Sequence, residues 1–110
     1  MTVQVEIVNR VDNDLVVAFQ RLIPQLSKSS PAPTKEQLES IVASDSSHIL
    51  LAKVDDVIVG SLTLVIFHIP TGVRAWIEDV VVDADARGKG VGEELNKFAL
   101  AEAKRQGATT

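Results

Sequence analysis

Residues 76–92 read WIEDVVVDADARGKGVG, and an amphipathic stretch follows them to about Gln106. The apolar run at the start of this segment predicts a strand, and the amphipathic stretch predicts a helix. Between them, Gly88, Gly90 and Gly92 lack Cβ atoms where the backbone must turn sharply or approach a ligand. Because the unpaired N–H groups at a helix N-terminus attract anions, this unit predicts a site for a phosphate or pyrophosphate.

Two common phosphate-binding loops do not fit this segment. The loop of nucleoside triphosphatases needs a lysine followed by serine or threonine where this chain has Glu93 and Glu94. The dinucleotide fingerprint needs a third glycine at position 93, and it opens near the first strand of a domain. Arg87 and Lys89 add positive charge to the rim of the loop. The residues alone leave two interpretations open, an anion site and a glycine-rich connection that binds nothing.

The rest of the chain predicts further strands and helices before this unit. Alternation predicts a first strand, and spacings of three and four predict two helices, the first ending or kinking near Ile23 because of Pro24. Thr34-Lys35-Glu36-Gln37 is a capping box for the second helix. The first predicted strand points Val3, Val5 and Ile7 inward, and the first helix is capped by Asp12 or Asp14 with these residues inward: Leu15, Ala18, Phe19, Leu22 and Leu26. The second helix is short and points Leu38, Ile41 and Val42 inward. Three strands follow at residues 48–54, 57–69 and about 73–83, the first two joined at Asp55-Asp56, and the last helix has these residues inward: Leu95, Phe98, Ala99 and Ala103.

Composition and charge limit the classes of function. The 110 residues are 45% hydrophobic and 24% charged, which is typical of one globular domain over residues 1–110. A net charge of −4 argues against nucleic-acid binding. The chain has no cysteine, which excludes disulfides, thiolate metal sites and cysteine nucleophiles, and no spacing of histidines and carboxylates suggests a metal.

The N-terminus carries no export signal, and the longest uncharged apolar stretch is too short to span a bilayer. That stretch runs from Val57 to Pro70 and is interrupted by polar residues. We therefore expect a cytoplasmic protein with no membrane partner.

The glycine loop and its neighbours resemble a known family. Residues 87–92 are similar to the Q/R-x-x-G-x-G/A signature of the GNAT superfamily of acyl-CoA-dependent N-acetyltransferases. Residues 77–83 resemble the fourth strand of that family, residues 59–64 its third strand and residues 22–26 its first helical region. The resemblance covers nearly the whole chain. It implies an α/β (α+β) fold with a mixed central sheet flanked by helices, in the order βααβββα plus a stub.

The resemblance also implies a coenzyme site. In this family the signature loop binds the pyrophosphate of coenzyme A, and a bulge in the fourth strand exposes backbone that pairs with the pantetheine arm. The implied coenzyme-binding residues here are Val80, Val81, Val82, Arg87, Gly88, Lys89, Gly90, Val91 and Gly92. The three consecutive valines abandon strict alternation, which either a bulge or a strand buried on both faces explains.

Glu78 aligns with a glutamate that serves some members of the family as the general base. The alternative is a solvated acid paired with Arg74, and Asp79 is the weaker candidate for the base. Trp76 lies two residues before Glu78 on the same strand face, so Trp76 and Arg74 are the candidate acceptor-binding residues. The alternative for Trp76 is an aromatic residue of the core or the sheet face.

The implied function is N-acetyltransfer from acetyl-CoA to a primary amine on a small molecule or peptide. Without cysteine an acetyl-cysteine intermediate is impossible, so the resemblance implies direct attack by the amine. The family domain continues into a fifth strand and a tyrosine that protonates the leaving thiolate, whereas this chain has no tyrosine and reaches only the stub at residues 108–110. We therefore expect a fold truncated before its fifth strand. The alternative function is a non-catalytic coenzyme A-binding or dimerisation module, in which a homodimer pairs the open edge of the fourth strand.

Overall fold

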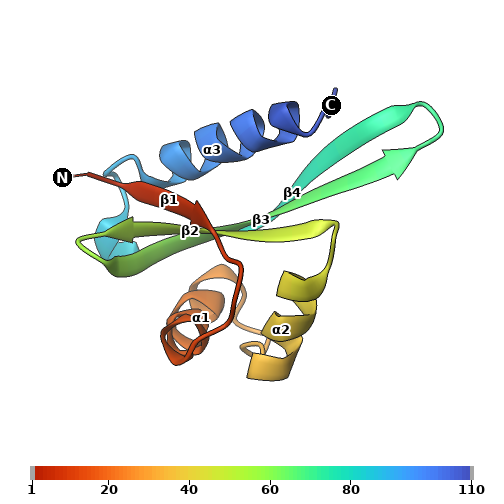
Figure 1. The fold of residues 1–110 in the computed structure, drawn as a ribbon. Coiled ribbons are helices and arrows are strands. Elements are labelled where there is room, and N and C mark those ends of the chain that lie inside the picture. The colour runs from red at the N-terminus through yellow and green to blue at the C-terminus, as the bar shows by residue number, and fades with distance from the viewer. Residues whose placement is uncertain (1, 110) are drawn as a thin grey trace.

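The computed structural model describes residues 2–109, and within them four antiparallel strands form one sheet in the order β1-β2-β3-β4. Each strand pairs with its neighbour in the sequence. Helix α3 covers one face of the sheet, and α1 and α2 cover the other (Figure 1). The elements are β1 (Gln4–Ile7), α1 (Asn13–Leu26), α2 (Lys35–Ala43), β2 (Ser47–Val54), β3 (Val57–Ile69), β4 (Gly72–Val82), the 3₁₀ turn η1 (Ala84–Ala86) and α3 (Val91–Arg105).

Each face of the sheet has its own hydrophobic core. Alternate residues of β2 and β3 point to opposite faces, so one strand supplies both cores. The core beneath α3 consists of Leu50, Ala52, Leu62, Leu64, Ile66, Ala86, Val91, Leu95, Ala99 and Ala103. The core beneath α1 and α2 consists of Leu15, Phe19, Leu38, Ile49 and Leu51. The predicted inward faces of the three helices are therefore confirmed, with one exception in α1.

That exception concerns the end of α1. Of the two predicted caps, Asp12 and Asp14, Asp12 is correct: it accepts a hydrogen bond from the N–H of Leu15 at 2.9 Å. The helix does not end near Ile23, because Pro24 lies in the last turn, and the N–H of Ser27 closes that turn on the carbonyl of Ile23 at 2.9 Å. Leu26 is 38% exposed, so its predicted inward position is wrong.

The predicted capping box and the first hairpin are confirmed. The N–H of Gln37 donates to Thr34 Oγ1 at 3.1 Å, and the N–H of Thr34 donates to Gln37 Oε1 at 2.9 Å. Asp55 and Asp56 join β2 to β3 with φ values of 52° and 65°, which a two-residue hairpin turn requires.

The segment after α3 begins a parallel pairing with β4. Gly107 ends the helix with a φ of 90°, and Ala108 then forms an isolated parallel bridge with Val73. The N–H of Thr109 donates to the carbonyl of Val73 at 3.1 Å. The predicted element order and the α+β class are confirmed. A mixed sheet was expected, and within the described residues its only parallel pairing is this bridge between Val73 and Ala108. Thr110, the last residue of the predicted stub, lies outside the described residues.

No helix in the described part of the chain combines the length and apolar character that a membrane span needs. Among the same residues, no group of three or more histidine or carboxylate side chains gathers in a way that could hold a metal ion.

Candidate functional site

A β-bulge interrupts β4 one residue after Glu78. Ser61 of β3 lies opposite Val81 and Thr63 lies opposite Glu78, so Asp79 and Val80 together oppose a single residue of β3. Asp79 takes the left-handed conformation with a φ of 52°. Of the two explanations for the consecutive valines, the bulge is therefore correct. Burial on both faces is wrong, because Val80 is 37% exposed.

The bulge reverses the alternation of β4. Ile77 and Val82 both pack against the core beneath α3, although an odd number of positions separates them. Val81 is only 4% exposed. Its carbonyl oxygen points toward β3, since it lies 3.1 Å from the position that a Cβ on Gly60 of β3 would occupy. The outer edge of β4 after the bulge is therefore formed by the backbone of Val80 and Val82.

The loop after β4 has the conformation that its glycines predict. Gly88 and Gly90 have φ values of 80° and 79°, which residues with a Cβ rarely adopt. A Cβ built on either glycine meets no atom within 4 Å, so the space above this backbone is open. Gly92 differs, because a Cβ there would lie 3.7 Å from Val82 and would be in ordinary contact.

The N-terminus of α3 opens onto the same space. Gly90 is the N-cap and has no side chain to accept hydrogen bonds from the first turn of the helix. The free N–H groups and the helix dipole therefore present partial positive charge at the end of the loop. Arg87 does not add its Nε–H to this rim, because that group donates to the carbonyl of Val82 at 3.2 Å and ties the loop to β4. Lys89 is exposed.

Arg74, Trp76 and Glu78 alternate along β4 on the face opposite α3. Glu78 is exposed and Trp76 is 61% exposed, so Trp76 is not a core residue. The guanidinium of Arg74 donates to the hydroxyls of Thr71 and Thr109, at 3.1 Å in each case. Among the described residues no ion pair joins Arg74 to Glu78, so the predicted alternative of such a pair is wrong.

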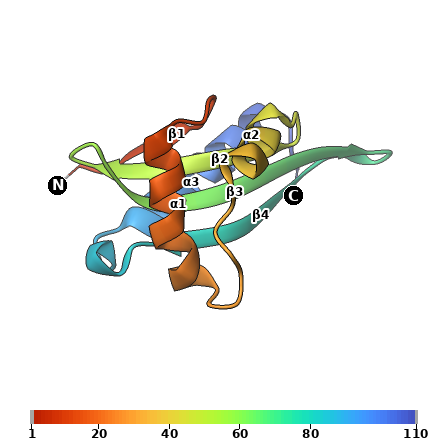
Figure 2. The same cartoon turned by 90° about the horizontal axis from the view of Figure 1, so that it is seen from below.

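Helix α1 contributes contacts to the loop that sequence analysis missed. Arg21 Nε donates to Asp83 Oδ2 at 2.9 Å, and the N–H of Ala84 donates to Gln25 Oε1 at 2.8 Å. Figure 2 shows α1 running across the sheet, with its C-terminal end on the β4 side. The spacing of four places Arg21 and Gln25 on one face of the helix, but nothing local in the sequence identifies their partners 62 and 59 residues away.

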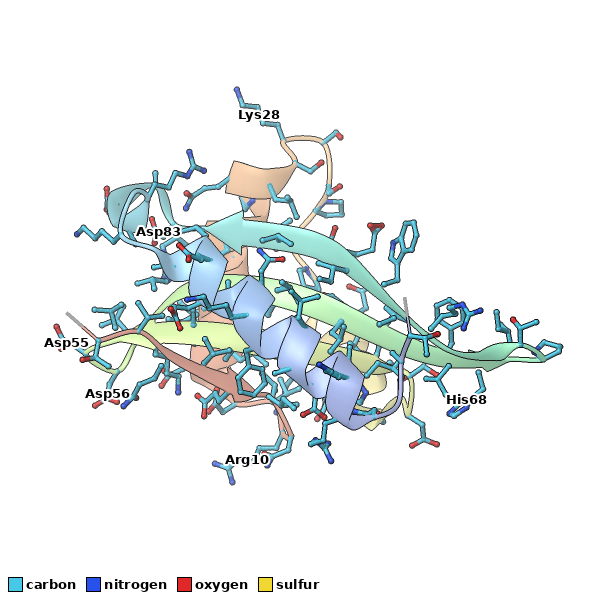
Figure 3. The ribbon with its side chains drawn as sticks, turned by 90° about the horizontal axis from the view of Figure 1, so that it is seen from above. Arg10, Lys28, Asp55, Asp56, His68 and Asp83 are labelled. Atoms are coloured by element: carbon cyan, nitrogen blue, oxygen red, sulfur yellow. The ribbon has the colours of Figure 1, made fainter. Side chains whose placement is uncertain are left out.

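The carboxyl group of Asp83 is held in its charged form. Burial raises its pKa, but hydrogen bonds from the N–H of Asp85 and from Arg21 outweigh this effect, and the pKa lies below its ordinary value of 3.8. Figure 3 shows Asp83 where β4 ends and the loop begins, far from His68 at the other end of the sheet.

A hollow of about 470 Å³ lies elsewhere, between β1, α1 and the β2–β3 hairpin. Its rim carries Arg10, Asp14 and Asp56, and beside them Lys53 forms an ion pair with Glu6 at 2.6 Å. None of the residues 74–92 lines this hollow. It is therefore separate from the glycine loop and from the exposed face of β4.

Comparison with known proteins relates this arrangement to one family. A model of the acetyltransferase (GNAT) family matches residues 12–110. A search of curated proteins finds no significant match. Among solved structures, a GNAT family acetyltransferase from Staphylococcus aureus superposes with a TM-score of 0.85 at 18% identity, over 99% of this chain and 83% of that one.

Two further structures share the fold. Glucosamine-6-phosphate N-acetyltransferase from Arabidopsis thaliana has a TM-score of 0.80 at 24% identity and covers 99% of this chain and 79% of its own. An aminoglycoside acetyltransferase from an uncultured soil metagenomic sample, in complex with sisomicin, has a TM-score of 0.83 at 21% identity. That match covers 96% of this chain and 72% of the other. At these identities the likeness establishes the fold.

Proposed function

The chain belongs to the GNAT acetyltransferase family, and from this we propose that it binds acetyl-CoA and transfers the acetyl group to a primary amine. The glycine loop is the observation that carries the proposal. Its backbone is open at Gly88 and Gly90, and it leads into a helix N-terminus without a side-chain cap. A pyrophosphate fits this arrangement because it accepts several hydrogen bonds from backbone N–H groups and interacts favourably with the helix dipole.

We assign the pyrophosphate to the backbone of residues 87–92. Arg87, Gly88, Lys89, Gly90, Val91 and Gly92 are the residues concerned, as the resemblance of the loop implies. Gly88 and Gly90 allow the close approach, and exposed Lys89 adds a positive charge near the anion. The Arg87 side chain has a different task, since its bond to Val82 shapes the loop. Val91 is buried in the core beneath α3 and contributes its N–H only.

The pantetheine arm is assigned to the outer edge of β4. Val80 and the N–H of Val82 lie on this edge, where the carbonyl of Val82 already accepts a bond from Arg87, whereas Val81 faces β3. The bulge at Asp79 and Val80 bends the strand, and a bent edge leaves room for an extended ligand beside it. Once bound, acetyl-CoA supplies an activated acyl group, and edge N–H groups are suited to polarise its carbonyl.

Glu78 is the proposed general base. The ammonium form of an amine acceptor must lose a proton before its nitrogen can attack a thioester, and an exposed carboxylate can accept that proton directly or through water. Trp76 and Arg74 lie on the same strand face, two and four residues before Glu78, and are the proposed acceptor-binding residues. The chain has no cysteine, so the amine attacks directly.

The proposed acceptor is a small molecule or peptide that carries a cationic amine. The net charge of −4 and the carboxylate of Glu78 favour a cation over an anion. The fold is shared with an acetyltransferase solved with sisomicin, an aminoglycoside ligand, and this choice of acceptor class follows that precedent.

An acetyl-transfer assay over a panel of primary amines tests the proposal. The unaltered chain should acetylate at least one amine, and Glu78→Gln should lower the rate about 10²- to 10⁴-fold while acetyl-CoA affinity is retained. An unchanged rate in Glu78→Gln would refute the assignment of the base. Trp76→Ala should raise the KM for the acceptor and leave the KM for acetyl-CoA unchanged.

A second candidate is a coenzyme-binding or dimerising module without turnover. One observation favours it: among the described residues, the backbone at the outer edge of β4 pairs with another segment only at Val73. An open edge favours pairing with a second copy of the chain. This candidate predicts acetyl-CoA binding without acetylation of any amine, and a dimer by ultracentrifugation.

A further inference from the structure

Two side chains of α1, one helical turn apart, hold the segment that enters the glycine loop. Arg21 Nε donates to Asp83 Oδ2 at 2.9 Å, and Arg21 also donates to the carbonyl of Ile58 at 2.5 Å. The N–H of Ala84 donates to Gln25 Oε1 at 2.8 Å. The other end of the Gln25 amide donates to the carbonyl of Arg21 at 3.2 Å, which orients that amide toward the loop.

Asp83 is the point at which these contacts meet the sheet. Its N–H donates to the carbonyl of Val59 at 2.7 Å and continues the pairing of β4 with β3. Its second carboxyl oxygen accepts the N–H of Asp85 at 3.3 Å and caps η1. Asp83 therefore connects β3, η1 and α1, and it sets the direction in which the backbone leaves β4. Figure 3 shows it at that junction.

The loop beyond this junction needs support from outside. Gly88 and Gly90 have wide conformational freedom, and a flexible loop loses entropy when a ligand orders it. Contacts that fix the entrance of the loop before the ligand arrives reduce that loss. The N-terminal anchors of the loop are the bonds of α1 to Asp83 and Ala84, together with the bond from Arg87 to Val82.

The same contacts contribute little to the stability of the whole fold. The side chain of Arg21 is 42% exposed and that of Asp83 is 16% exposed, so solvent reaches the pair from the Arg21 side and limits its effect on the free energy of unfolding. Gln25 and Ala84 lie outside the two hydrophobic cores. A strong effect of these groups is therefore expected on the loop and not on the cores.

We propose that Arg21 and Gln25 are positioning residues that preorganise the loop between β4 and α3 for coenzyme binding. This inference rests on the proposed function, because it assumes that the loop binds acetyl-CoA. It adds to that function a role for α1, a helix on the opposite face of the sheet from α3 (Figure 1). The conformation of α1 and the affinity for the coenzyme are thereby coupled.

Calorimetric titration of acetyl-CoA into variants of the full chain tests the proposal. Arg21→Met and Gln25→Met remove the polar groups and keep side-chain length, and each should raise the Kd for acetyl-CoA about three- to tenfold, as expected for the loss of one or two hydrogen bonds. Gln20→Met, at an exposed position of α1, is the matched control and should leave the Kd unchanged. Arg21→Lys should restore part of the affinity, because it keeps a charge that reaches Asp83.

Two further measurements separate positioning from general stability. The melting temperature of the ligand-free chain should fall little in either variant, and amide hydrogen exchange should speed up in residues 84–92 but not in β2. If acetyl-CoA turnover is measurable, its KM should rise while kcat at saturating coenzyme is kept.

The outcomes distinguish this inference from the proposed function. If the unaltered chain binds acetyl-CoA and both methionine variants bind it with the same Kd, the positioning role is overturned and the proposed function stands. A higher Kd that comes with unfolding of the ligand-free variants, with no gain in Arg21→Lys, also overturns the positioning role. Absence of binding by the unaltered, folded chain overturns the proposed function itself.

Discussion

Ile77 and Val82 pack into the same core beneath α3, although five positions along β4 would place them on opposite faces of a regular strand. The bulge at Asp79 and Val80 causes this reversal. It turns Val81 inward and leaves Val80 at the open edge, directly after the regular part of the strand in which Glu78 is exposed. The candidate pantetheine-binding edge therefore depends on this irregularity, which begins at the residue after the candidate base.

Asp79 occupies the left-handed conformation of the bulge, with a φ of 52°. Asp79→Val should lower the free energy of unfolding by about 1–2 kcal/mol, because a β-branched residue is strongly disfavoured there. Asp79→Gly should be neutral or slightly stabilising, since glycine adopts this conformation without strain. Urea denaturation measures both. Equal destabilisation by the two substitutions would show that the aspartate side chain, not the backbone conformation, stabilises the bulge.

Gly60 allows β3 to approach both β4 and α3. A Cβ at this position would lie 3.1 Å from the carbonyl oxygen of Val81 and 3.1 Å from the side chain of Val91. Because a backbone oxygen cannot move aside easily, Gly60→Ala should destabilise the fold by about 1–3 kcal/mol, the usual cost of overpacking. Gly92→Ala is the control, since its Cβ would meet Val82 at 3.7 Å. Urea denaturation should show a loss of stability in the first variant only.

The ion pair between Arg21 and Asp83 should weaken in acid. Burial raises the pKa of Asp83, but hydrogen bonds from Asp85 and Arg21 lower it by more, so the folded pKa lies below the ordinary value of 3.8. Stabilisation from such a group is complete above the unfolded pKa and is lost as the pH falls through the folded pKa. The difference in unfolding free energy between the unaltered chain and Asp83→Asn should be constant above about pH 5 and shrink below the ordinary pKa. A difference that does not change with pH would contradict the ionised state of Asp83.

Much of the fold could be predicted because it depends on local patterns. The capping box at Thr34, the turn at Asp55-Asp56 and the inward residues of α3 follow from short-range spacing, and the structure confirms them. The sharp turn of the loop could likewise be predicted, because Gly88 and Gly90 occupy the two positions that have left-handed φ values. These features need no knowledge of distant contacts.

The rest depends on contacts between distant segments. The valine run in β4 allows two explanations because its register is set by pairing with β3. The left-handed position of the bulge is also hard to identify from sequence, since it is occupied by Asp79 and not by a glycine. Of the predicted kink or end of α1 near Ile23, the end is wrong: the helix continues to Leu26, because Pro24 lacks only its own backbone N–H and lies in the last turn. The contact of Arg21 with Asp83 spans 62 residues and has no local signal.

Coenzyme binding by the glycine loop is tested most directly by a calorimetric titration of acetyl-CoA into the unaltered chain, Gly90→Glu and Gly107→Glu. Both glycines have left-handed φ values, 79° and 90°, and they lie at opposite ends of α3, so the two substitutions impose similar backbone strain. Only Gly90→Glu places a bulky anion in the loop. We expect binding by the unaltered chain and by Gly107→Glu, and loss of binding in Gly90→Glu with the fold intact by circular dichroism. Equal affinity of Gly90→Glu and the unaltered chain, or no binding by the folded unaltered chain, would contradict the assignment of the coenzyme to residues 87–92.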